Sequence, residues 1–106
     1  MAEIKIIWHP IAIEELKEIL DFYIWRNQST SYSEKLLVKI NKSLTSLQQF
    51  PLAAKNTDEP AIRYLLVDNN YIFYSFLEDS KIYVLMLTDA RKNPKTIQTK
   101  LQKRAK

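Results

Sequence analysis

The sequence predicts an α+β fold in the order β-α-α-β-β-β, with a helical hairpin packed on one face of a mainly antiparallel four-stranded sheet. Three observations predict it. Apolar residues alternate with polar ones at the start of the chain and again after residue 61, they recur at helical spacing in between, and polar turn-forming segments separate these stretches. A chain of 106 residues, 46% of them hydrophobic, is expected to form one domain with its own core.

The first strand and the first helix follow from the residues near the N-terminus. Ile4, Ile6 and Trp8 fall on one side of a strand over residues 4–8. Pro10 fits the first turn of a helix, because no amide hydrogen bond is lost there. Helical spacing then continues to about residue 27, and His9 is expected to help cap this helix or to lie at the surface. The acidic residues of the helix are expected to form a solvated face and not a metal site: Glu14, Glu15, Glu18 and Asp21.

A second helix is predicted after the polar break at residues 27–31. Ser31 and Glu34 have the spacing of a capping box, and Pro51 ends the helix soon after Phe50. The two helices are joined by a short polar segment, so they are expected to pack as an antiparallel hairpin on the sheet. The helical residues predicted for the core are Leu16, Ile19, Leu20, Leu37, Ile40, Leu44 and Leu47.

Three strands are predicted in the second half of the chain, over residues 62–67, 71–77 and 82–87. Turns without glycine join them at residues 68–70 and 78–80, where Asn, Asp and Ser tolerate the required backbone conformations. Alternation in the middle strand divides its aromatic residues between the two faces of the sheet. Ile72, Tyr74 and Phe76 are assigned to the core, while Tyr71 and Phe73 lie on the other face, where stacking on nucleic-acid bases is the alternative role.

Charge and composition exclude several classes of function. The chain has no cysteine, no glycine and a single histidine, which excludes thiol chemistry, glycine-dependent phosphate loops and histidine-rich metal sites. No cofactor and no metal are expected. There is no apolar run long enough to cross a membrane and no signal-peptide pattern near the N-terminus, so a cytoplasmic protein without a membrane role is expected.

The basic residues are concentrated at the C-terminal end. Residues 91–106 hold seven of the sixteen Lys and Arg residues and none of the twelve Asp and Glu residues, so this segment carries +7 and residues 1–90 carry −3. Residues 1–94 are therefore described as the domain and residues 95–106 as a basic C-terminal segment. Two interpretations of this segment stay open: a solvated tail that could include a short helix, or a contact surface for a polyanion or an acidic partner.

Several motifs follow one another in a fixed order along the whole chain: a strand ending in tryptophan that leads into a helix, a leucine pair followed by proline, an arginine-bearing strand, an aromatic hairpin strand, and an aliphatic strand that ends in a basic pair and a proline. They are Trp8-His9-Pro10 with Ala12, Leu16, Ile19 and Tyr23; Leu44, Leu47, Phe50 and Pro51; Ile62-Arg63; Tyr71-Ile72-Phe73-Tyr74; and residues 85–94. Together they resemble the RelE/ParE superfamily of toxins from type II toxin–antitoxin modules.

This resemblance implies growth inhibition by a toxin that a cognate antitoxin holds inactive. RelE-like members are ribosome-dependent messenger-RNA endonucleases that use no metal, whereas ParE-like members bind DNA gyrase, and fold alone does not decide between them. The sequence has Asp89 where many RelE-like toxins carry a histidine, and Ile72 at a position usual for arginine. These differences favour the ParE-like function. The endonuclease, a degenerate toxin and a non-toxic nucleic-acid-binding regulator remain alternatives.

The candidate site residues are cations and hydroxyl or carboxyl groups near the ends of the last strands. Arg63, Arg91 and Lys92 are expected to lie together at the open face of the sheet, although a structural ion pair of Arg63 with Asp89 or Glu78 is an equal alternative. RNA cleavage would also need a base and an acid, for which Asp89 and a hairpin tyrosine, Tyr71 or Tyr74, are the candidates. If the protein only binds its target, Arg63, Tyr71, Tyr74, Arg91 and Lys92 are the expected binding residues.

Overall fold

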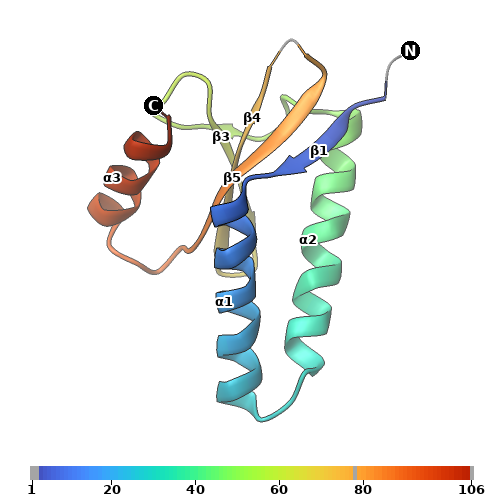
Figure 1. The fold of residues 1–106 in the computed structure, drawn as a ribbon, viewed down its shortest axis with the longest axis vertical. Helices are drawn as coiled ribbons and strands as arrows, with labels where there is room; N and C mark the ends of the chain where they lie inside the picture. Colours follow the sequence, from blue (N-terminus) through green and yellow to red (C-terminus); the bar gives the residue numbers. More distant parts are fainter. Residues whose placement is uncertain (1–2, 78, 106) are drawn as a thin grey trace.

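Three helices and a five-stranded sheet make up the fold, which confirms the predicted α+β class (Figure 1). The structure is a computed structural model that describes residues 3–77 and 79–105, so Glu78 lies outside the described residues. The elements are β1 (Lys5–Trp8), α1 (Pro10–Asn27), α2 (Ser31–Gln49), β2 (Lys55–Asn56), β3 (Arg63–Val67), β4 (Asn70–Phe76), β5 (Lys81–Asp89) and α3 (Pro94–Ala105).

The sheet has the strand order β1-β5-β4-β3-β2. Strand β1 pairs with β5 in parallel, and the other neighbours are antiparallel. The predicted strand count of four was wrong by one, because the connection after α2 contributes the two-residue strand β2. Its residues lie beside Arg63 and Tyr64 of β3. A pairing of two residues leaves no alternating pattern in the sequence, so periodicity could not reveal it.

The two predicted helix starts have different outcomes. Helix α1 is capped by His9, whose Nδ1 accepts a hydrogen bond from the Ile11 amide at 3.1 Å, as expected. Helix α2 begins at Ser31, but the predicted capping box between Ser31 and Glu34 is not formed. Ser31 is already helical and its amide donates to the Ser29 hydroxyl, while the Thr30 hydroxyl donates to the Glu34 carboxylate. The cap is thus displaced by one residue.

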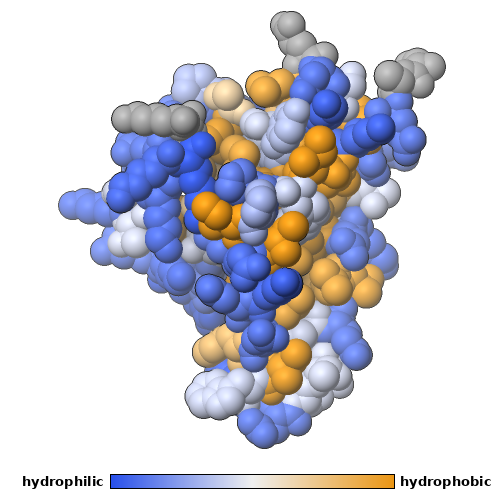
Figure 2. Space-filling model, viewed as in Figure 1, coloured by the Kyte–Doolittle hydropathy of each residue, from blue (hydrophilic) through white to orange (hydrophobic). Residues whose placement is uncertain are grey.

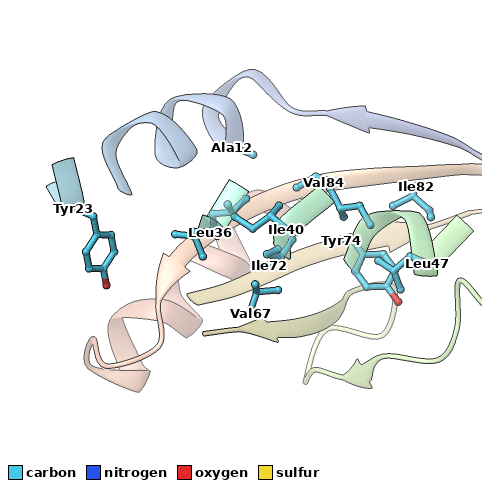
Figure 3. Packing of buried hydrophobic residues seen from close by; sticks show 12 residues of the cluster. Ala12, Tyr23, Leu36, Ile40, Leu47, Val67, Ile72, Tyr74, Ile82 and Val84 are labelled. Atoms are coloured by element: carbon cyan, nitrogen blue, oxygen red, sulfur yellow. The ribbon is translucent and has the colours of Figure 1, made fainter. Parts of the chain in front are cut away.

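Helices α1 and α2 run side by side and cover one face of the sheet, as predicted (Figure 1). Ile72, Tyr74, Ile82 and Val84 extend from the strands into the same cluster as the α2 residues (Figure 3). The assignment of Leu37 to this core was wrong, since Leu36 is 0% exposed and Leu37 is 37% exposed. Because residues 36 and 37 are both leucine, the apolar pattern of the sequence does not show which of them faces the core. The other predicted helical residues line the core, either fully or partly buried: Leu16, Ile19, Leu20, Ile40, Leu44 and Leu47.

Strand β5 contains a bulge that resets which side chains face the helices. Phe73 lies opposite Met86 but Tyr74 lies opposite Val84, which leaves Leu85 as an extra residue. Val84 and Leu87 therefore both join the core under α1 and α2, while Leu85 and Met86 both face the opposite side. The segment is apolar on both faces because both are covered, one by α1 and α2 and the other by apolar residues of α3.

An ion pair holds the backbone of β5 at this bulge. The Arg104 guanidinium of α3 donates to both carboxylate oxygens of Glu15 in α1, at 2.7 and 2.8 Å. Glu15 Oε1 also accepts from the Leu87 amide at 3.1 Å, and Arg104 Nη1 donates to the Leu85 carbonyl at 3.1 Å. Glu15 thus binds α3 and β5, although the sequence had assigned it to a solvated face.

The basic segment forms most of α3, and this helix covers part of the face that the sequence left open. Ile97 and Leu101 are buried against Ile62, Phe73 and Met86 in a second apolar cluster. The interpretation as a solvated tail was therefore wrong for this part of the segment, because an apolar stripe runs between its charges. None of the helices in the described residues is long and apolar enough to cross a membrane.

The position of Leu36 gives a first test of the packing. We expect Leu36→Ala to lower the free energy of unfolding by about 2–5 kcal/mol, because it leaves a cavity in a closed core. Leu37→Ala, the matched control, should cost about 1 kcal/mol or less, since its side chain is partly in solvent. Urea denaturation followed by circular dichroism measures both, and equal losses would contradict this packing.

The ion pair gives a second test. We expect Arg104→Met to destabilise the protein by about 3 kcal/mol, because it leaves the largely buried Glu15 carboxylate without its partner. Amide hydrogen exchange in α3 should accelerate as well. The neighbouring substitution Lys103→Met removes the same charge from an exposed position and should change neither quantity. Slow exchange in α3 of the Arg104→Met variant would show that the ion pair does not hold this helix.

Candidate functional site

Arg63 has a structural position away from the other candidate cations. It lies on β3 opposite Tyr74 of β4. Asp89 of β5 lies opposite Asn70, which is four residues before Tyr74 in β4. That separation corresponds to about 13 Å along the strand. Arg63 Nη1 donates to the carbonyls of Leu52 and Ala54, at 3.1 and 3.0 Å. The predicted grouping of Arg63 with Arg91 and Lys92 is thus absent, and so is its ion pair with Asp89.

Tyr74 is fixed in the same region as Arg63. Its side chain is 0% exposed, and its hydroxyl donates to the Pro51 carbonyl at 2.7 Å. Burial raises the pKa of the Tyr74 phenol, although the nearby Arg63 charge opposes this shift. Both side chains bind the chain that leaves α2, so they keep residues 51–54 against the edge of the sheet.

Asp89, the last residue of β5, forms a close pair with Arg91. The Asp89 carboxylate accepts from the backbone amide of Arg91 at 2.8 Å, from its Nε at 3.0 Å and from its Nη2 at 2.7 Å. These hydrogen bonds lower the pKa of the Asp89 carboxyl and raise that of the Arg91 guanidinium. Arg91 Nη2 also donates to the Tyr23 hydroxyl of α1 at 3.3 Å. The guanidinium is therefore fixed, yet the Arg91 side chain as a whole is about half exposed.

Arg91 contributes to an open surface depression with Arg26 of α1, which we call the Arg26–Arg91 depression. It has a volume of about 330 Å³. Its lining residues are Tyr23, Arg26, Asn27, Tyr32, Asn69 and Arg91. Lys92, the next residue along the chain, is also exposed. Of the three predicted cations, Arg91 alone lines this depression, beside Arg26, which sequence reasoning missed. Lys92 lines a second pocket, with Glu18 and Phe22.

A polar network beside this depression was also missed. Asp68, in the turn between β3 and β4, accepts from the Tyr32 hydroxyl at 2.9 Å and from Lys39 Nζ at 3.0 Å. Burial and the bond to Asp68 raise the pKa of Tyr32 to about 12, and the bond from Lys39 lowers the pKa of Asp68. Tyr32 and Lys39 are seven residues apart, about two helical turns, which places them on the same side of α2. This spacing is the feature of the sequence that could have indicated the network.

Tyr71 lies on the other side of the sheet. Its ring packs against those of Tyr64 and Phe73, with centroids 5.3 and 5.7 Å away, in the cluster that α3 covers. The three candidates for proton transfer therefore have unrelated surroundings: Asp89 is bound to Arg91, Tyr74 is buried, and Tyr71 faces α3. Among the residues that the structure describes, no three His, Asp or Glu side chains come together as a metal site.

Comparison with known proteins gives both a family and a fold. The family described as "ParE toxin of type II toxin-antitoxin system, parDE" matches residues 6–94. No curated protein sequence matches the chain. A solved structure of the chromosomal ParDE toxin–antitoxin system from P. aeruginosa is 18% identical and has a TM-score of 0.71; the match covers 84% of this chain and 98% of that one.

A second solved structure has the same fold. It is a double arginine-to-alanine mutant of the E. coli toxin RelE in the free state, 13% identical, with a TM-score of 0.61 and coverage of 96% of this chain and 98% of that one. At these identities the two structures show a shared fold, while the family match covers most of the sequence. The protein belongs to the ParE toxin family of type II toxin–antitoxin systems.

Proposed function

We propose that this toxin acts in the cytoplasm by binding DNA gyrase, and that a cognate antitoxin neutralises it. The observation that supports inhibition by binding is the separation of the residues that RNA cleavage would require. Asp89 is held by three hydrogen bonds from Arg91, which lower its pKa and make it a weaker base. Tyr74 has no access to solvent, and Tyr71 lies on the opposite side of the sheet.

The Arg26–Arg91 depression has the residue types of a protein-binding surface. Trp25, 71% exposed, and Phe22, 45% exposed, lie on α1 close to Arg26, and their ring centroids are 6.3 Å apart. Tryptophan and arginine are enriched among the residues that dominate protein interfaces. Cations and exposed aromatic rings together suit a protein target with acidic and apolar groups, and we place the contact with gyrase here.

The antitoxin is proposed to bind the helical face. Figure 2 shows apolar side chains gathered along the middle of this face, over β1 and between α1 and α2, surrounded by hydrophilic residues. The exposed large hydrophobic residues of these elements include Ile7, Ile11, Ile13, Leu37 and Val38. Adjacent apolar surface of this kind is typical of a binding site for a protein segment. The similar P. aeruginosa structure is that of a ParDE toxin–antitoxin system, which supports an antitoxin partner for this chain too.

The proposal is tested by comparing two activities of the same preparation. The chain, made by cell-free translation, is added to gyrase with relaxed plasmid, and separately to a translation reaction with a defined messenger RNA. Inhibited supercoiling with intact messenger RNA supports the proposal. Cleaved messenger RNA with normal supercoiling would instead identify a ribosome-dependent endonuclease, and inactivity in both assays would favour a degenerate toxin or a regulator.

Substitution of the exposed cations should separate target binding from folding. We expect Arg91→Ala with Lys92→Ala to reduce growth inhibition by about tenfold or more, because truncating an interface hot spot costs roughly 2 kcal/mol or more. Lys35→Ala with Lys42→Ala removes two exposed charges from α2 and should have little effect. Thermal melting checks that both variants fold. Unchanged inhibition by the first variant would contradict a role for these cations.

Asp89→Asn distinguishes binding from cleavage. If the toxin binds its target, this variant should keep most of its activity, since the amide can still accept a hydrogen bond from Arg91. If Asp89 were a general base, the loss in the rate of messenger-RNA cleavage should reach about 100-fold or more. Growth inhibition and cleavage rate, measured on the same variant, decide between the two.

The charge of α3 gives a further expectation for the antitoxin complex. Lys95, Lys100 and Lys103 are exposed on this helix and would attract an acidic stretch of the partner. We expect the affinity to fall as salt rises from about 0.05 to about 0.5 M, because exposed charges are screened beyond roughly 8 Å already at physiological ionic strength. Isothermal titration calorimetry at both salt concentrations measures this, and a constant affinity would remove the electrostatic contribution.

A further inference from the structure

A groove lies between α3 and the face of the sheet that α1 and α2 leave free. We call it the aromatic groove, and its volume is about 340 Å³. Tyr64, Tyr71 and Phe73 of β3 and β4 form its floor, and Ile97 and Leu101 of α3 line its side. The loop before β3 adds Asp58 and Glu59 at the margin. The groove is separate from the Arg26–Arg91 depression, with which it shares no residue.

The three rings of the floor are arranged at different angles. Tyr64 and Tyr71 are nearly perpendicular, with an interplanar angle of 85° and centroids 5.3 Å apart, while Phe73 is tilted by 42° and 56° to them. Both tyrosines are partly exposed to solvent. Rings set at such angles offer a face to a group that enters between them, and aromatic faces attract cations through their negative potential.

The charge of the groove has the sign opposite to that of the whole protein. The chain carries +4, yet Asp58 and Glu59 are the charged residues that line the groove, and no Lys, Arg or His lines it in the part of the chain that is described. The Glu59 carboxylate has no hydrogen bond or ion pair to any described side chain. A phosphate group would be repelled here, so nucleic acid fits this groove poorly, whereas a cation fits it.

The wall formed by α3 is held in place from both sides. Gln98 Nε2 donates to Asp58 Oδ2 at 2.9 Å, which connects the middle of α3 to the loop at the groove margin. The Arg104–Glu15 ion pair fixes the far end of the helix. The groove therefore exists in the free protein and needs no partner to form.

We propose that the aromatic groove binds an arginine side chain of a protein partner. A guanidinium is planar, so it can stack on Tyr64 or Tyr71 while its edge donates hydrogen bonds to a carboxylate. A lysine ammonium is more strongly hydrated and cannot stack in this way. This site is independent of the gyrase and antitoxin proposals, because it rests on the isolated chain and can be tested on it alone.

The experiment uses the full chain labelled for NMR and capped amino acids as probes. Nα-acetyl-arginine amide should shift the ring resonances of Tyr64, Tyr71 and Phe73. Nα-acetyl-citrulline amide has nearly the same shape without the charge, and it should bind at least about tenfold more weakly, as the loss of a cation–π contact and a charged hydrogen bond implies. The lysine derivative should fall between them.

Two variants locate the binding. Tyr71→Leu and Glu59→Gln should each weaken arginine binding by about three- to tenfold. Tyr83→Leu and Glu14→Gln, which change the same residue types outside the groove, should leave it unchanged. Glu59 is at the margin and not in the apolar cluster, so its substitution tests the site even if Tyr71→Leu disturbs folding.

Three results would overturn the proposal. The first is equal affinity for the arginine and citrulline derivatives, or no binding of either. The second is arginine binding that Glu59→Gln leaves intact. The third is a stronger response of the same ring resonances to adenosine monophosphate than to arginine, which would indicate a nucleotide site.

Discussion

The ion pair between Glu15 and Arg104 joins the parts of the protein that the sheet does not connect by itself. Strand β1 ends beside Val84, so the rest of β5 has no neighbouring strand on that side, and the bulge at Leu85 lies just there. Glu15 and Arg104 bind the amide of Leu87 and the carbonyl of Leu85 in place of the missing strand. Their side chains are only 16% and 18% exposed. Helix α1, strand β5 and helix α3 are thereby fixed at one point. The position of α3 in turn determines the shape of the sheet face that lies opposite α1 and α2.

The described part of the protein has three surfaces of different chemical character, and α3 forms one side of the third. The helical face is largely apolar along its middle, the Arg26–Arg91 depression is cationic, and the aromatic groove is acidic at its margin. Such separate surfaces would allow a small protein to bind more than one partner without changing shape. The residues that would have to act together in RNA cleavage have three unrelated surroundings: Asp89 is bound to Arg91, Tyr74 is buried in the core, and Tyr71 lines the aromatic groove. Their separation is the observation behind the proposal that the toxin inhibits by binding.

Much of the fold could be predicted from the sequence, because periodicity reports local structure well. Helices α1 and α2 and the meander of β3, β4 and β5 were visible in this way. What failed depends on long-range contacts. Glu15 looked like an ordinary solvent-facing acid because its partner is 89 residues away. Arg63 was expected to join the other cations or to pair with a carboxylate, since nothing near it in the sequence indicates two carbonyl acceptors in the chain after α2. Whether Leu36 or Leu37 enters the core depends on how α2 is rotated about its axis against the sheet, which the sequence does not give. The proximity of Arg91 and Lys92 could be predicted because the two residues are neighbours in the sequence.

The absence of glycine has a consequence for how the toxin meets its partners. Gln28, Asp68 and Ser80 adopt left-handed backbone conformations without glycine, and Asp68 is additionally fastened by Tyr32 and Lys39. Residues with a Cβ atom have fewer backbone states than glycine, so the turns resist bending and the loops offer no easy hinge. Association then costs this chain little conformational entropy, and the preorganised surface leaves most of the induced ordering to the other molecule. In a complex, this chain would then contribute a surface whose shape is already set before binding.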